Sequence, residues 1–286
     1  MTSNSPRSKT SPNPTRPNPN RANPSRDRKG AVALHAVLPL CPFQERWVDD
    51  ASRFKIAVKA RRIGFTFATT LEIAPLIESL QDLSTGNPRM NTYTHQRHDV
   101  DVLTTGVGMV ATSAWCSLVL AQEKYDLSLN LGVCGSFDRT LELGTVVHVV
   151  SDRIAELGAE DGEDFVTIHE LKLVAENEFP FASGRLMSSK PPASATLSGL
   201  PAATGITVNT VHGNRLSIEK VTERFAPQVE SMEGAAFMYT CLIHEVPFAQ
   251  VRAVSNFVEP RNREAWKMPE AIAALSDTAL QILNDL

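Results

Sequence analysis

The chain alternates short apolar runs with longer helical segments, and this alternation limits the folds open to it. Four runs lack the polar alternation of a strand with one wet face: RIGFTFA (Arg62–Ala68), VDVLTTG (Val100–Gly106), LSLNLGVCG (Leu127–Gly135) and TVVHVVSDRI (Thr145–Ile154). Strands of this kind are covered on both faces, as in parallel sheets between layers of helices. The sequence therefore predicts a single three-layer α/β domain with a mixed, mostly parallel β-sheet flanked by helices.

The remainder of the chain continues this pattern. Two more strands are expected, GITVNTV (Gly205–Val211) and the run VPFAQVRAVS that ends at Ser255. Helices are expected over TTLEIAPLIESLQDL, from Met109 to about Lys124, from about Leu216 to Arg224, after Glu233, and from about Pro269 to the end. No segment repeats with a period of 20–50 residues, so residues 62–286 are predicted to form one domain.

Residues 1–61 differ in composition from the rest. The first thirty residues are rich in Pro, Ser and Asn and carry a charge of +6, whereas the remaining residues carry −10. Such a segment has too little apolar surface to fold, and we expect residues 1–61 to be a disordered leader that folding and activity do not need. The apolar run Ala31–Phe43 is broken by two prolines and lacks a small-x-small cleavage site, which argues against an export signal.

Charge and cysteine content exclude several classes of protein. The negative charge of residues 31–286 argues against a nucleic-acid surface, and no apolar run is long enough to span a membrane. The four cysteines show no CxxC spacing and suit reduced thiols better than disulfides or a metal site. We therefore expect a cytoplasmic protein without a metal.

Polar residues and glycines gather where the predicted strands end, which is where parallel α/β sheets bind ligands. The set comprises Thr69, Thr70, Glu72, Gly106, Gly108, Gly132, Cys134, Gly135, Ser136, Asp152, Asn209–Asn214, Glu233, Ser255 and Asn256. Each has a simple structural explanation when taken alone: Glu72 fits a capping box with Thr69, and Glu233 a first-turn acid facing the helix dipole. Together they predict a glycine-lined site with two carboxylates and a carboxamide.

Five motifs resemble a known superfamily. They are ATTLEIAPL (Ala68–Leu76), NLGVCGSF (Asn130–Phe137), DRIAELGAEDG (Asp152–Gly162), VESMEGAA (Val229–Ala236) and VRAVSNFVEPRNREAW (Val251–Trp266). Their order resembles the nucleoside phosphorylase and nucleosidase superfamily, and the AELGAED and SNFVEPRNR pieces resemble its futalosine hydrolase branch. Those enzymes take part in menaquinone biosynthesis by way of futalosine. The resemblance implies that residues 62–286 are a nucleosidase catalytic domain.

The resemblance also implies roles for individual residues in cleaving an N-ribosidic bond without a cofactor. Glu72 would orient and deprotonate the attacking water, and Glu233 would bind the ribose hydroxyls and stabilise the positive sugar. Met232 and Ser136 would complete the ribose site. The base would lie against Cys134, Gly135, Val211, His212 and Asn256. The nucleoside would be a small-molecule substrate of a homodimer or larger homo-oligomer.

Asn256 and Glu72 bear on which member of the superfamily this is. Related adenosine-type nucleosidases have an aspartate at the position of Asn256; a carboxamide cannot act as an acid, but it can donate to N7 or O6 of hypoxanthine. A carboxylate at position 72 would repel phosphate, which favours hydrolysis over phosphorolysis. A methylthioadenosine/S-adenosylhomocysteine nucleosidase, a purine nucleoside phosphorylase and a non-catalytic nucleoside-binding protein remain alternatives.

Two arginines follow Asn256 closely. Futalosine carries an aromatic carboxylate on its 5′ side, and Arg261 or Arg263, next to Trp266, could bind it through the guanidinium group. The opposing interpretation is a solvated loop in which Glu259 or Glu264 neutralises both arginines.

Overall fold

The computed structural model describes residues 61–82 and 89–286. All residues of the predicted leader, including Cys41, lie outside these ranges, except for Arg61, its last residue. The expectations that the leader is disordered and dispensable therefore stay predictions.

The centre of the ten-stranded sheet is parallel. β1 (Arg61–Phe67) lies between β4 (His98–Thr104) and β5 (Leu127–Ser136) and runs parallel to both. β12 (Phe248–Phe257) is parallel to β5 and antiparallel to β6 (Val146–Asp152). The outer strands are β10 (Ala202–Thr207) and β11 (Val229–Ser231) on one side, β3 (Met90–His95) and β2 (Gln81–Asp82) on the other, and β9 (Leu186–Met187) beside β6.

The sheet also closes on itself. β11 pairs antiparallel with β5 through Val229–Ser136 and Glu230–Gly135, so β5, β12, β6, β10 and β11 form a ring of paired strands. This closure places Glu230 beside Gly135, although the two residues are far apart in the sequence.

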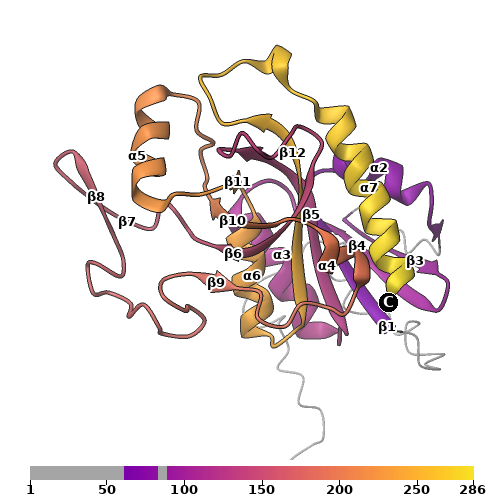
Figure 1. The fold of residues 1–286 in the computed structure, drawn as a ribbon. Coiled ribbons are helices and arrows are strands. Elements are labelled where there is room, and N and C mark those ends of the chain that lie inside the picture. The colour runs from indigo at the N-terminus through magenta and orange to yellow at the C-terminus, as the bar shows by residue number, and fades with distance from the viewer. Residues whose placement is uncertain (1–60, 83–88) are drawn as a thin grey trace, which may run out of the picture. The chain divides into compact units, whose positions relative to one another are not determined.

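Helices cover both faces of the sheet (Figure 1). α2 (Thr70–Ile77), α4 (Ala195–Gly199) and α7 (Met268–Asp285) share one side, and α3 (Met109–Gln122) and α6 (Gly234–Ile243) pack together on the other. β1 contributes to both layers, because Phe65 joins the core with Leu275 of α7 while the next residue, Thr66, contacts Cys116 of α3. The predicted α/β fold with a mostly parallel sheet is confirmed. No helix in the two described ranges is both long enough and apolar enough to cross a membrane.

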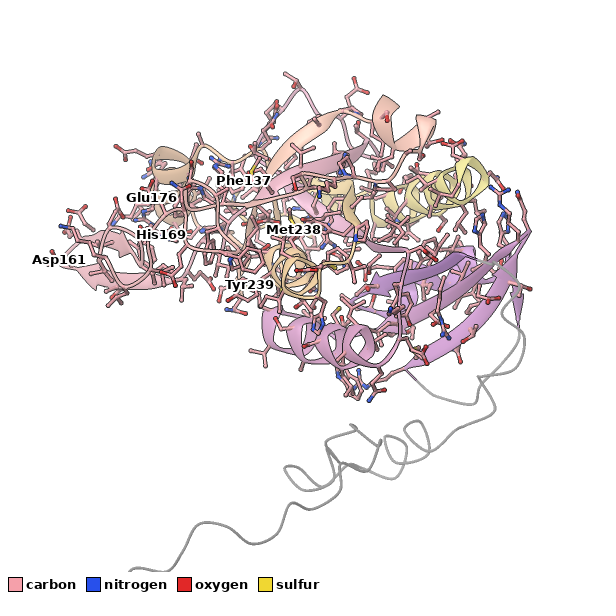
Figure 2. All side chains as sticks on the ribbon, turned by 90° about the horizontal axis from the view of Figure 1, so that it is seen from below. Phe137, Asp161, His169, Glu176, Met238 and Tyr239 are labelled. Atoms are coloured by element: carbon pink, nitrogen blue, oxygen red, sulfur yellow. The ribbon has the colours of Figure 1, made fainter. Side chains whose placement is uncertain are left out.

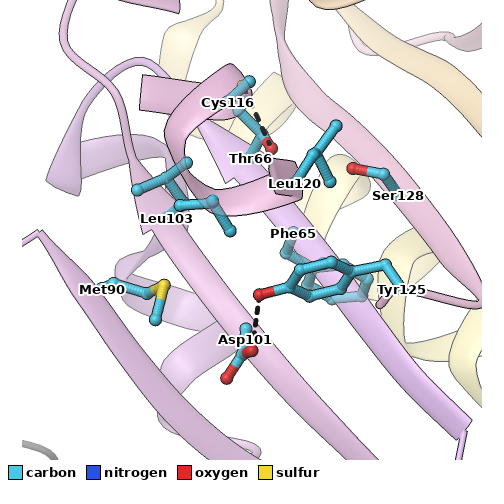
Figure 3. A pocket seen from close by; sticks show the side chains of 11 residues that line it. Phe65, Thr66, Met90, Asp101, Leu103, Cys116, Leu120, Tyr125 and Ser128 are labelled. Carbon is cyan, nitrogen blue, oxygen red and sulfur yellow. Dashed lines mark hydrogen bonds between the residues drawn. The ribbon is translucent and has the colours of Figure 1, made fainter. Parts of the chain in front are cut away.

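A small cavity lies under α3, between β1 and β4 (Figure 3). Its volume is about 10 Å³, too small for a nucleoside. The buried Asp101 beside it accepts hydrogen bonds from the Tyr125 hydroxyl (2.7 Å) and from Arg62 Nε (2.8 Å). Burial, together with the Asp101 charge, raises the pKa of the Tyr125 hydroxyl. This region is a satisfied structural network rather than a ligand site.

The structure differs from the sequence expectations at several segments. The acidic stretch Glu156–Asp164, where no strand was predicted, forms part of a hairpin of β7 (Gly158–Asp161) and β8 (Asp164–Thr167), because backbone groups pair with one another around Gly162. The predicted strand Gly205–Val211 ends at Thr207, and the first predicted helix ends at Ile77, two residues after Pro75. The β3–β4 hairpin was not predicted.

The segment between β8 and β9 is anchored to α6 by aromatic side chains. The Phe181 ring packs edge-on against His169 (5.1 Å between centroids) and against Tyr239 of α6 (5.9 Å). Figure 2 shows His169 between Tyr239 and Asp161, which lies at the end of β7 away from α6. The hairpin therefore projects from a base that is fixed by packing.

Candidate active site

A cavity of about 340 Å³ opens where β5 and β12 end and α2 and α6 begin. Seven of the residues to which the resemblance assigns a role line it: Glu72, Cys134, Gly135, Val211, Met232, Glu233 and Asn256. Thr69 and Ser255 of the predicted set line it as well. The remainder of its wall is largely apolar and includes Leu71, Val107, Trp266, Met268 and Ile272. A mostly apolar cavity with a few convergent polar groups is typical of a small-molecule site.

Glu72 belongs both to the helix cap and to the cavity wall. Its Oε2 accepts hydrogen bonds from Thr69 N (2.9 Å) and Thr69 Oγ1 (3.1 Å), while its Oε1 accepts one from Val133 N (3.2 Å). The two interpretations of Glu72 from the sequence are therefore compatible. The cap and the strand amide hold the carboxylate in one orientation at the edge of the cavity.

Glu233 stands at the start of α6 and is buried. Its Oε1 accepts a hydrogen bond from Gly108 N at 3.0 Å. Gly108 has a φ of 94°, so this close backbone approach favours glycine. Burial raises the pKa of the Glu233 carboxyl, while the Arg252 cation and the Gly108 amide lower it. The cavity therefore holds a second carboxylate at a fixed position.

The start of α6 is tied to the sheet beneath it. Ala235 N donates to Thr207 Oγ1 at 2.7 Å, and that oxygen lies 3.1 Å from both carboxylate oxygens of Asp152. Asp152 is fully buried, and burial raises its pKa to about 6. A side chain at position 234 would collide with Asp152 and Gln250, which explains Gly234 in the MEG motif. These contacts fix the helix end that carries Glu233.

Arg252 is a site residue that the sequence interpretation missed. It is 1% exposed, and its guanidinium group donates to Asn130 Oδ1 and lies 4.0 Å from Glu233 Oε2. A Cβ at Gly132 would collide with this guanidinium and would lie 3.1 Å from Glu72 Oε1. A buried cation thus lies close to both carboxylates. The sequence feature that could have identified Arg252 is the presence of an arginine within the apolar run VPFAQVRAVS.

A β-bulge decides where Asn256 points. Val254 pairs with Cys134 and Asn256 with Gly135, so Ser255 is an extra residue in β12. Bulges of this kind re-aim side chains next to functional sites. Asn256 Oδ1 accepts from Ser255 Oγ (2.9 Å) and Nδ2 donates to Phe257 O (3.0 Å), which leaves one amino hydrogen without a partner among the residues that the structure describes.

A smaller cavity of about 60 Å³ shares Gly135, Val211, Glu230, Asn256 and Trp266 with the main cavity. His212 and Arg261 line this smaller space but not the larger one. The guanidinium carbons of Arg261 and Arg263 lie 5.4 and 5.9 Å from the centre of the Trp266 ring. The structure therefore puts Arg261 at the end of the site that contains Asn256, and Arg263 beyond the lining of both cavities.

Ser136 does not join the other predicted residues. Its hydroxyl donates towards the carbonyl oxygens of Asp138 (2.9 Å) and Gln228 (3.2 Å), and it is fully buried. The turn after β5 uses this hydroxyl, and its position gives no support to the predicted ribose contact. Within residues 61–82 and 89–286, no three His, Cys, Asp or Glu side chains are grouped so that they could hold a metal ion.

Comparison with known proteins gives the family. The family model described as "Phosphorylase superfamily" matches residues 62–285. The chain belongs to the phosphorylase superfamily. It is 32% identical to a futalosine hydrolase of Streptomyces coelicolor over 183 residues, which cover 62% of this chain and 75% of the relative. The resemblance drawn from the motifs is confirmed, and so is the prediction of an enzyme of the futalosine hydrolase type.

Solved structures share the fold. A native futalosine hydrolase of Helicobacter pylori superposes with a TM-score of 0.65 at 14% identity, covering 79% of this chain and 99% of the other. A 5′-methylthioadenosine/S-adenosylhomocysteine nucleosidase of Colwellia psychrerythraea in complex with adenine superposes with a TM-score of 0.64 at 21% identity, covering 81% and 98%. At these identities the superpositions establish the architecture of the chain.

Proposed function

We propose that this protein hydrolyses the N-ribosidic bond of futalosine and releases hypoxanthine and dehypoxanthine futalosine. The observation that carries the proposal is the single cavity lined by Glu72, Glu233 and Asn256. It offers a base for water, an acceptor for sugar hydroxyls and a donor for a purine, which are the three groups that the reaction needs.

The attacking water would lie between Glu72 and Glu233, close to Arg252. Glu72 is held by Thr69 and Val133 and removes the proton as the C–N bond breaks. The Arg252 guanidinium lies 4.0 Å from Glu233 Oε2 and lowers the pKa of that carboxyl, which partly offsets the effect of its burial. The proton leaves the water only when the sugar has become a strong electrophile.

Glu233 would bind the two vicinal ribose hydroxyls. A carboxylate has two acceptor oxygens, and only Oε1 is engaged by Gly108. As the C–N bond breaks, positive charge develops on the ribose, and the negative carboxylate stabilises that charge in a cavity whose wall is largely apolar. Met232 lines the same cavity and would pack against the sugar.

Asn256 would hold the departing base. Its free amino hydrogen can donate to N7 or O6 of hypoxanthine, whereas the 6-amino group of adenine would meet a donor. This counts against a methylthioadenosine/S-adenosylhomocysteine nucleosidase, the activity named for the Colwellia neighbour. The carboxylate of Glu72 counts against a phosphorylase, and the presence of both Glu72 and Glu233 against a non-catalytic binding protein.

Base release from a panel of purine nucleosides tests this proposal. We expect hypoxanthine to be released from futalosine, more slowly from inosine, and with no dependence on added phosphate. Chromatography of the products also identifies the sugar, because hydrolysis leaves a free ribosyl hydroxyl and phosphorolysis leaves a sugar phosphate. A requirement for phosphate, or release of adenine in preference to hypoxanthine, would reject the proposal.

One of the two arginines, Arg261 or Arg263, is proposed to bind the carboxylate of futalosine, either in its own site or in that of a neighbouring subunit. Both guanidinium groups pack on Trp266, which lines the main cavity. We expect Arg261→Met or Arg263→Met to raise KM for futalosine about tenfold, while cleavage of inosine, which lacks the carboxylate, stays the same. Arg215→Met on the exposed surface of α5 (Arg215–Phe225) is the matched control.

Steady-state kinetics on both substrates decide between two sites of action for these arginines. Equal losses on futalosine and inosine would place the arginine at the base, in line with the position of Arg261 in the smaller cavity. No loss on either substrate would mean that the carboxylate is bound elsewhere.

We also propose that the protein acts in the cytoplasm as a homodimer or larger homo-oligomer. The cavity has an apolar side formed by exposed residues such as Leu71 and Val107, which a neighbouring subunit could cover. Light scattering of the purified protein measures the assembly state directly, and a monomeric mass in an active preparation would reject this part of the proposal.

A further inference from the structure

Glu230 is a buried carboxylate that the mechanism above does not use. Its side chain is 3% exposed, yet it lines both the main cavity and the smaller one. The pairing of β11 with β5 places it next to Gly135. A Cβ on Gly135 would lie 3.2 Å from Asn256 Nδ2 and 3.6 Å from Glu230 Cγ. The carboxylate and the carboxamide therefore flank one glycine at the same end of the site.

His212 holds this carboxylate in place. Glu230 Oε1 accepts a hydrogen bond from His212 N (3.0 Å), and Oε2 lies 2.6 Å from His212 Nδ1. Each carboxylate oxygen can accept two hydrogen bonds, so one acceptor position on each oxygen remains available. A buried carboxylate that lines a cavity and keeps free acceptor positions is suited to a ligand that donates an N–H group.

We propose that Glu230 is a specificity-determining residue that accepts the N1–H of a 6-oxopurine while Asn256 donates to O6 or N7. The inference rests on the proposed function, because it concerns the base end of that same site. A 6-oxopurine presents a donor at N1 beside an acceptor at O6, and Glu230 and Asn256 supply the complementary pair. Adenine presents an acceptor at N1 and a donor at the 6-amino group, so both of its groups are mismatched. His212 positions Glu230.

Free bases test the inference without any catalytic step. Calorimetry would compare the binding of hypoxanthine, 1-methylhypoxanthine, which has no N1–H, and adenine to the full-length protein and to Glu230→Gln. We expect the unmodified protein to bind hypoxanthine at least tenfold more tightly than either other base, the size of effect expected for one charge-assisted hydrogen bond in a buried site. Glu230→Gln should lose that tenfold advantage while its affinity for 1-methylhypoxanthine changes little.

Glu259→Gln is the matched control. It makes the same chemical change in the wall of the same smaller cavity, but the Glu259 carboxylate is paired with Arg139 at 2.7 Å. We expect it to keep the preference for hypoxanthine. If Glu230→Gln does not fold, equal binding of hypoxanthine and 1-methylhypoxanthine by the unmodified protein would still overturn the inference.

The possible outcomes separate this inference from the proposed function. A protein that does not distinguish hypoxanthine from 1-methylhypoxanthine overturns the inference, as does a Glu230→Gln variant that retains the preference. Glu230-dependent selection of hypoxanthine in a protein that does not cleave futalosine would support the inference and reject the proposed function. Cleavage of futalosine that is unaffected by Glu230→Gln would support the proposed function and reject the inference.

Discussion

Glu72→Gln is expected to lower kcat by about 10²- to 10⁴-fold while substrate affinity stays close to that of the unmodified protein. The amide keeps the size of the side chain and one acceptor oxygen, so the hydrogen bonds from Thr69 or Val133 are retained in part. It cannot take a proton from water at neutral pH. Single-turnover rates with futalosine and calorimetric affinities measure the two effects separately.

The helix cap could account for some of the loss, and a control variant addresses this. Losing one capping hydrogen bond costs about 1 kcal/mol of stability, which thermal unfolding detects, but it does not remove a proton acceptor. Glu78→Gln makes the same substitution at the exposed end of α2 and should leave kcat unchanged. If Glu72→Gln turned over at nearly the normal rate, Glu72 would be a helix cap only and the hydrolytic mechanism would be wrong.

Asn256→Asp is expected to change the ratio of kcat/KM for inosine to that for adenosine by about 10²-fold in favour of adenosine. A carboxylate oxygen in place of Nδ2 would face both Phe257 O and the purine O6, so acceptors would oppose acceptors. The same oxygen can accept from the 6-amino group of adenosine. If the carboxylate at position 256 took up a proton, the repulsion between acceptors would be relieved. The protonated carboxyl would then be an acid for the leaving base.

Asn262→Asp provides the comparison for this variant. Asn262 also lines the smaller cavity but lies on the exposed loop before η3 (Arg263–Ala265), so the same change of charge should leave the substrate ratio near its original value. Kinetics on both nucleosides at one pH give the ratio. If Asn256→Asp left it unchanged, Asn256 would have no part in reading the base.

Local patterns in the sequence determined the architecture and much of the site. Runs such as RIGFTFA have no polar face, so they had to be covered on both sides, and β1 is indeed packed between α7 and α3. Strand ends in a parallel sheet meet at one edge, which is why the order of strands and helices along the chain was enough to assign Glu72, Glu233 and Asn256 to one cavity. The glycines at positions 108 and 135 were found by the same argument.

Contacts between distant segments decided the rest. The bulge at Ser255 depends on the register of β12 against β5, and the position of Glu230 depends on the pairing of β11 with β5. Arg252 reaches the carboxylates only because Gly132 on the neighbouring strand leaves room for it, whereas Ser136 is engaged by the turn that follows it. Strand register and ring closure are set by the packing of whole elements, and a change of one residue in register turns a side chain to the other face of the sheet. Strand boundaries follow from local sequence, but the polar groups that meet at the end of the cavity are selected by the tertiary pairing of the strands.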